Sequence, residues 1–146
     1  MISVTVSVDT SRFDRMMSDF PAALARARSR ALSWIGQHVA TDATLAFRAP
    51  SLRPSPWAPR KDKKSKHPLL IRSGSLRQSI RWRITAADTV EVGSDKKYAS
   101  FHQDGTRNMP ARPFFPVDRN GNLTPRIMRK IDADIDKAYS AELGRM

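Results

Sequence analysis

The sequence predicts an α+β fold, in which a small, mostly antiparallel sheet packs against a long N-terminal helix and a C-terminal helix. Segments that alternate apolar and polar residues open the chain and recur in its middle, which indicates strands. Two long segments have apolar residues at helical spacing. Between them lies a long basic loop, rich in proline and expected to be flexible, at about residues 49–68. The chain has 146 residues and is expected to form a single domain over 1–146.

The residues before the basic loop predict a strand and two helices. Residues 2–8 alternate isoleucine or valine with hydroxyl side chains, which is the pattern of a half-buried strand. After a short helix, Pro21 suits the first turn of a long helix, whose apolar stripe extends from Leu24 to about Phe47. This helix is expected to end before Pro50, because a proline disfavours helical backbone in the residue that precedes it.

The residues after the basic loop predict shorter elements and one further long helix. A single helical turn is expected around Leu76, a hairpin of two strands at 80–85 and 90–92, and another helical turn at 98–103. The apolar residues of 114–117 predict one more short strand. A C-terminal helix is expected to begin at a threonine–proline pair, with the threonine as its cap.

The charge and composition of the chain limit its possible partners. The formal net charge is +12, which favours contact with nucleic acid, an acidic protein surface or anionic lipid. The absence of cysteine excludes disulfides and thiolate chemistry. No apolar run approaches the roughly 20 residues of a membrane-spanning helix, and the first residues lack the pattern of a signal peptide. We therefore expect no membrane partner and synthesis in the cytoplasm.

The basic loop is a candidate contact for DNA or for a protein partner. Trp57 lies within it and Trp82 beside it, and basic residues interleaved with aromatic ones are typical of nucleic-acid-binding surfaces. The alternative interpretation is a solvated loop that contributes only solubility. The candidate contact residues are Arg60, Lys61, Lys63, Lys64, Lys66, Arg81 and Arg83.

Two histidine–aspartate pairs are the candidates for catalysis or metal binding. His38 and Asp42 share a helix face but leave a metal with too few ligands. His102 and Asp104 lie beside a glycine, and no nucleophile or substrate proton is evident near them in the sequence. No GxSxG, HExxH or phosphate-binding glycine motif is present. We therefore predict that the chain is not an enzyme and uses no metal or cofactor.

Three ordered blocks between residues 69 and 117 resemble a known family. Their residues are Ser73, Gly74, Leu76 and Ser79; then Tyr98, Ala99, His102, Gln103 and Gly105; then Pro110, Ala111, Arg112, Pro113 and Phe114. In these blocks the chain resembles the phage virion morphogenesis family, which includes tail completion proteins of Mu-like phages and related head–tail joining proteins. Asp104 and Phe115 depart from the family pattern, which usually has an aromatic residue and a leucine at these positions.

The resemblance implies a structural virion protein that acts in tail completion or head–tail joining, at the head-proximal end of the tail. It implies a ring of identical subunits, with six copies expected, that contacts tail tube or head connector proteins. A closed ring needs two complementary patches on each subunit, and the basic loop and the acidic side chains of the C-terminal helix are candidates. These acidic residues are Asp132, Asp134 and Asp136.

In such a ring, arginines at the channel would contact passing DNA without reading its sequence. Two alternatives remain open on the sequence alone. One is a small basic nucleic-acid-binding module, and the other is a hydrolase that uses His102 and Asp104.

The PARPFF segment suits a structural role better than a catalytic one. Pro110 and Pro113 restrict the backbone and remove amide donors, so we expect a rigid, extended segment. Arg112 between them is expected to hold a carboxylate or carbonyl oxygens in a two-point fork. Tyr98 and His102 are four residues apart, so they should share one face of a helical turn. We therefore interpret residues 98–114 as scaffold and interface.

Overall fold

The computed structural model describes residues 2–62, 64, 66, 69–71 and 73–145 and has the predicted α+β fold. A three-stranded antiparallel sheet, with strand order β1-β3-β2, packs against a long helix, and a second long helix packs on the first. The strands are β1 (Ile2–Ser7), β2 (Arg81–Ala86) and β3 (Thr89–Ser94). The helices are α1 (Ser11–Met16), α2 (Pro21–Leu45), α3 (Ser75–Gln78), α4 (Ala99–Asp104) and α5 (Pro125–Leu143), with a 3-10 turn, η1, at Pro50–Leu52.

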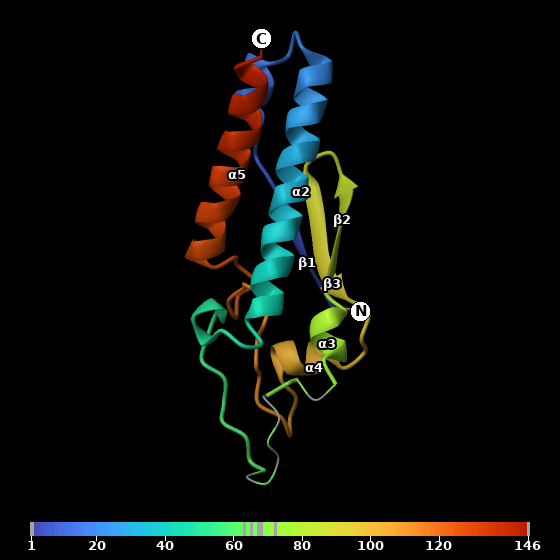
Figure 1. Cartoon of the computed structure of the whole chain (residues 1–146), viewed down its shortest axis with the longest axis vertical. Helices are drawn as coiled ribbons and strands as arrows, with labels where there is room; N and C mark the ends of the chain where they lie inside the picture. The colour runs from blue at the N-terminus through green and yellow to red at the C-terminus, as the bar shows by residue number, and fades with distance from the viewer. Residues whose placement is uncertain (1, 63, 65, 67–68, 72, 146) are drawn as a thin grey trace.

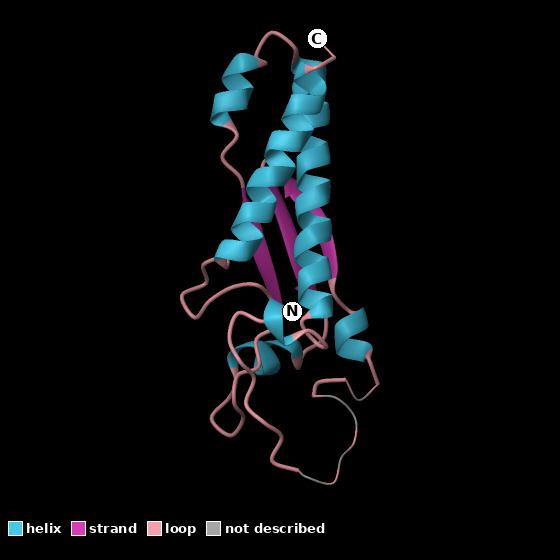
Figure 2. Cartoon of the chain, turned by 60° about the vertical axis from the view of Figure 1, so that its left-hand side comes forward, coloured by secondary structure: helices cyan, strands magenta, loops and turns pink. Residues whose placement is uncertain are grey.

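The molecule is elongated, and its two long helices lie side by side along the long axis (Figure 1). The short helices α3 and α4 and the basic loop gather at the end of the molecule opposite the C-terminus (Figure 1). Figures 1 and 2 both show α2 and α5 on the same side of the three strands. One face of the sheet is therefore covered by helix and the other is open.

The alternation of side chains along the strands matches this arrangement. Val6, Val90 and Val92 are buried and lie on the face that α2 covers. Trp82 lies on the same face, where Gly36 of α2 makes room for it, because a Cβ at that glycine would lie 2.6 Å from the indole ring. The opposite face, here called the open face, consists of Ser3, Thr5, Ser7, Arg81, Arg83, Thr89, Glu91 and Gly93.

Ion pairs join the two long helices at their margins. Glu142 of α5 is 0% exposed and accepts hydrogen bonds from Arg26 of α2, with Arg26 Nη2 3.2 Å from Glu142 Oε2. These hydrogen bonds hold the pKa of Glu142 below its ordinary value of 4.5. Lys130 Nζ of α5 lies 3.1 Å from the buried Asp42 of α2. Because a buried carboxylate without its partner is strongly destabilising, these pairs disfavour other registers of the two helices.

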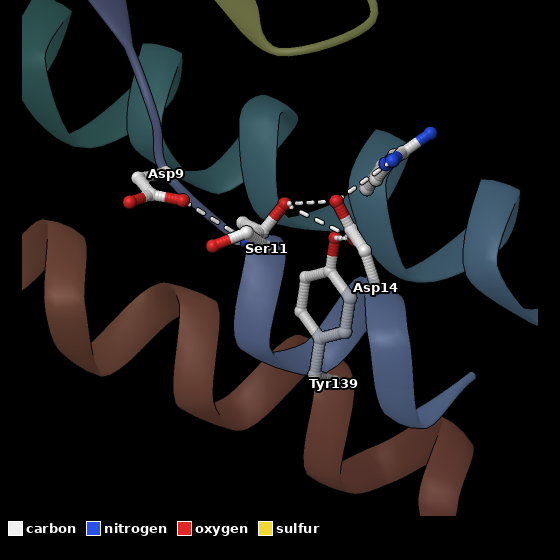
Figure 3. A network of polar contacts seen from close by, with 6 residues as sticks. Asp9, Ser11, Asp14 and Tyr139 are labelled. Carbon is white, nitrogen blue, oxygen red and sulfur yellow. Dashed lines mark hydrogen bonds and ion pairs between the residues drawn. The ribbon is translucent and has the colours of Figure 1, made fainter. Parts of the chain in front are cut away.

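A polar cluster around Asp14 ties α1 to both long helices (Figure 3). The Asp14 carboxylate accepts hydrogen bonds from Tyr139 Oη of α5 at 3.2 Å, from Arg28 Nη2 of α2 at 2.8 Å and from Thr10 Oγ1 at 3.1 Å. The Tyr139 ring also stacks on Phe13, with 4.8 Å between centroids. Burial raises the pKa of Tyr139, so its hydroxyl stays protonated and donates at neutral pH.

Candidate functional site

The three sequence blocks that resemble a known family meet at one end of the molecule. Residues 73–79 contain α3, residues 98–105 contain α4, and residues 110–115 return beside α4; together they are called the platform here. A groove of about 560 Å³ is lined by residues from all three blocks and by the basic loop. Its lining residues include Ser73, Gly74, Leu76, Tyr98, His102, Arg112 and Arg60.

The first block connects the platform to the sheet. Gly74 has φ +80°, a left-handed conformation that a residue with a side chain rarely adopts, and it directly precedes α3. The Ser73 hydroxyl hydrogen-bonds Ser75 at 3.0 Å, and Leu76 is buried in the core. The buried Ser79 hydroxyl lies 2.6 Å from that of Ser94, the last residue of β3. The serines of this block therefore hold α3 in place and connect it to the sheet.

Gln103 fixes the turn between the second and third blocks. It is 8% exposed, and its Oε1 accepts hydrogen bonds from the backbone N–H groups of Phe114 and Phe115, each at 3.0 Å. The predicted short strand at 114–117 is therefore wrong, because these amides bond a side chain instead of a neighbouring strand. The structure has only an isolated bridge here, between Val117 and Leu123, among the residues it describes.

Gly105 lets the chain reverse directly after α4. Its φ is +76°, and a Cβ added to it would lie 2.7 Å from the backbone nitrogen of Ala111. The reversal is closed by hydrogen bonds between Thr106 and Met109 and by one from Arg112 N to His102 O at 2.7 Å. The platform therefore needs glycine here both for backbone conformation and for space.

Arg112 makes the predicted two-point fork, and its partners belong to the basic loop. Its Nε donates to Ala58 O at 3.0 Å and its Nη2 donates to Pro59 O at 3.2 Å. Trp57, beside these residues, donates from Nε1 to Pro113 O at 2.7 Å. Residues 57–59 and the PARPFF segment therefore hold each other through three hydrogen bonds.

The first part of the basic loop packs on the core, which differs from the expectation of a loop that is flexible over its whole length. Trp57 contacts Phe47 edge to face, with 6.0 Å between ring centroids. The guanidinium of Arg53 lies 3.6 Å from the centre of the Trp57 ring, and its Nε donates to Ala46 O at 2.7 Å. The prediction relied on the charge and proline content of the segment. It did not consider that one tryptophan, together with arginine side chains that donate to backbone oxygens, is sufficient to pack residues 50–59.

The candidate contact residues for DNA do not form one patch. Arg81 and Arg83 lie on the open face of the sheet, and Arg83 pairs with Glu91 at 3.0 Å. Lys61, Lys64 and Lys66 are exposed on the loop at the platform end, Arg60 is half-buried, and Lys63 lies outside the described residues. Trp57 and Trp82 pack against the core, so neither is presented as a free stacking surface for bases.

Limited trypsin digestion of the free protein is expected to cleave first after Lys61 and Lys64, because their exposed segment is predominantly basic and has little apolar surface to bury. Arg107 is an internal comparison, since it is exposed but lies in the reversal closed by Thr106 and Met109. Mass spectrometry of early fragments measures both sites. Cleavage after Arg107 as fast as after Lys61 would contradict this prediction.

The two histidine–aspartate pairs do not build a catalytic or metal site among the described residues. His38 Nδ1 lies 2.6 Å from the buried Asp134 of α5, while Asp42 pairs with Lys130. No cluster of three or more potential metal ligands occurs in this part of the chain. Asp134 is consequently unavailable to a neighbouring subunit, which corrects the prediction that it belongs to an exposed acidic patch; Asp132 and Asp136 are exposed.

His102 contacts the platform through both its backbone and its ring: its carbonyl accepts from Arg112 N, and its ring packs against Tyr98. The rings of Tyr98 and His102 meet edge to face at 6.0 Å, which confirms that they share one face of α4. Burial lowers the pKa of His102, and the nearby Arg112 lowers it further, so the imidazole is neutral at pH 7. Within the described residues, no hydrogen bond or ion pair joins His102 to Asp104. Among the described residues, His102 therefore lacks the carboxylate partner that orients the histidine of a nucleophile–histidine–carboxylate site.

The motif residues thus connect loops at one end of a scaffold made of two long helices and a small sheet. The chain belongs to the phage virion morphogenesis family, which matches residues 8–131. Comparisons with curated proteins and with solved structures gave no match. The family match indicates a role in building the phage particle and covers the sheet hairpin, the platform and α2 in full. None of the helices within the described ranges is long and apolar enough to cross a membrane.

Proposed function

We propose that the chain is a ring-forming subunit that acts in tail completion and joins the tail to the head at the head-proximal end of the tail. The platform is the observation that carries this proposal. Its family-motif residues Gln103 and Arg112 join α4, the PARPFF segment and residues 57–59 through side-chain hydrogen bonds to backbone groups. A fixed surface of this kind suits docking between virion proteins, because little conformational entropy is lost on binding.

The platform also presents apolar surface for a partner. Tyr98, the residue that caps α4, is 40% exposed, and Phe101 of α4 is 51% exposed. Aromatic side chains are enriched at protein–protein interfaces. Tail tube or head connector proteins are the partners we propose for this surface. A ring of six copies is expected, placed in the virion around the path of the DNA.

The test uses a phage that carries this chain, with its gene interrupted. Electron microscopy of the lysate is expected to show filled heads and separate tails, and wild-type protein supplied in trans should restore joined particles. The purified protein should form ring-shaped particles in negative stain as its concentration rises. Joined, infectious particles without the protein would overturn the proposal.

A small basic nucleic-acid-binding module is the second candidate, and the exposed lysines of the loop favour it. That candidate predicts a monomer that shifts DNA in a salt-dependent manner. It also predicts that changing Lys61, Lys64 and Lys66 to glutamine removes the function, while changes on α4 do not. Sizing and DNA binding measured on the same preparation separate the two candidates.

A further inference from the structure

We propose that neighbouring subunits of the ring pair through their sheets, with β1 of one copy beside β2 of the next. The sheets then form one continuous wall, and the open face of each sheet lines the channel. This inference rests on the proposed ring, and it names the two complementary patches that a closed ring requires.

Both outer strands of the sheet have a free edge. The strand order β1-β3-β2 places β1 and β2 at the two edges, and each has six residues. In the part of the chain that the structure describes, no backbone hydrogen bond joins Ile2–Ser7 or Arg81–Ala86 to a segment outside the sheet. An unpaired strand edge presents a row of N–H and C=O groups that another strand can satisfy.

The edge of β1 borders a groove with room for an added chain. Ile2, Ser3 and Val4 line one side of this groove, whose volume is about 910 Å³. The other side includes Pro54, Pro56 and Pro113. These prolines have no N–H group to donate to a strand, and among the described residues no backbone hydrogen bond joins this wall to β1. An extended segment from a second copy fits these conditions.

The edge of β2 fits β1 of a second copy better than it fits another β2. Arg81 and Arg83 would face the same two arginines across a β2–β2 pair, and like charges opposite each other are destabilising. The open-face residues of β1 are hydroxyl side chains without charge. Ile84 is 41% exposed although it lies on the covered face, and a neighbouring strand would cover it. The irregularity between Ile84 and Ala86 limits pairing to the first part of β2.

The direction of the strands agrees with a ring. Both β1 and β2 are antiparallel to β3, so they are parallel to each other. Rotation about a channel axis preserves strand direction, so β1 and the next subunit's β2 meet as a parallel pair. The channel wall would then carry serine and threonine hydroxyls and the positive charge of Arg81, while the charge of Arg83 is balanced by Glu91. Such a wall lets DNA pass without sequence-specific contacts.

Cysteine cross-linking tests this arrangement directly, because the chain contains no cysteine. Thr5→Cys and Arg83→Cys each change an exposed residue of the open face. Within one subunit both positions lie opposite Glu91, close enough for a bismaleimide to join them, so the two cysteines are placed on separate chains. Mixed and treated with a short bismaleimide, the two single variants are expected to give a covalent dimer, whereas each single variant alone stays monomeric. A control mixture of Thr5→Cys with Ser140→Cys, on the exposed side of α5, should give no covalent dimer.

Three results would overturn the inference, and they differ in whether the proposed ring would also be wrong. Rings in negative stain without a covalent dimer in the mixture of the two single variants mean that other surfaces build the ring, so the proposed function stands and the inference fails. A covalent dimer of the Thr5→Cys single variant means β1–β1 pairing. If mass photometry detects no oligomer for the wild type or the variants, both the proposed ring and the proposed pairing of the sheets are wrong.

Ile84→Lys tests the same interface without a cross-linker. This exposed position should accept lysine with an unchanged melting temperature, while the fraction of oligomer falls at least tenfold in mass photometry. Met128→Lys, at an exposed apolar position on α5, is the matched control and should assemble normally. Normal assembly of Ile84→Lys would also overturn the inference.

Discussion

Replacement of Gln103 by methionine is expected to lower the melting temperature by about 10 °C, which corresponds to a loss of on the order of 3 kcal/mol in the free energy of unfolding. Methionine matches glutamine in length and fills the same space, but it offers no amide oxygen. The N–H groups of Phe114 and Phe115, both on buried residues, would lose their acceptor. Each buried donor without a partner costs roughly 1–3 kcal/mol.

Gln78→Met is the matched control, because Gln78 is exposed on α3 of the same platform. It should change the melting temperature by less than about 2 °C, since exposed substitutions are usually within roughly 0.5 kcal/mol. Thermal unfolding followed by circular dichroism measures both variants. Equal melting temperatures for the two variants would show that Gln103 does not hold the PARPFF segment.

The elements that the sequence predicted well are those with local signals. The alternation in 2–8 predicts β1, and Pro21 and Pro125 begin helices at the positions where proline is favoured. Each of these signals depends on neighbours within a few residues. The strand predicted at 114–117 failed because its amides are satisfied by Gln103, which lies 11 and 12 residues away in the chain. Apolar composition could not reveal that partner.

Charged and aromatic residues were harder to interpret than apolar ones, because distant partners decide their exposure. Asp134 belongs to an acidic helix in the sequence, yet it is buried against His38, 96 residues away. Trp57 lies within a basic segment, yet its indole donates to Pro113, 56 residues away. An interpretation based only on the composition of their segments treats both residues as exposed. Their contacts arise only when α2, α5 and the platform come together.

The candidate site itself was predicted in part. The family resemblance selected Gln103, Gly105 and Arg112, and the chemistry of a guanidinium between two prolines predicted a fork. The partners of the fork, Ala58 O and Pro59 O, could not be predicted, because backbone carbonyls carry no signal in the sequence. The same limit applies to the two sheet edges, which become visible only once the strand order is known.

Replacement of Arg112 by lysine is expected to lower the free energy of unfolding by about 2 kcal/mol and the melting temperature by about 6 °C. Lysine keeps the positive charge, but its single ammonium cannot donate from two fixed nitrogen positions to the carbonyls of Ala58 and Pro59. Residues 57–59 should then lose one of their two attachments to the platform, while the hydrogen bond from Trp57 remains. Hydrogen exchange of these residues should become faster.

Arg107→Lys is the matched control for Arg112→Lys, because Arg107 is exposed in the neighbouring reversal and its substitution should change the melting temperature by less than about 2 °C. If the platform docks on virion proteins, the two variants should also differ in the phage. Arg112→Lys should yield fewer joined particles, and Arg107→Lys should restore them as wild type does. Identical melting temperatures and identical particle yields would mean that Arg112 is an ordinary surface charge. The basic loop would then be attached to the PARPFF segment through Trp57 alone, and the rigidity of the platform would have to come from Gln103.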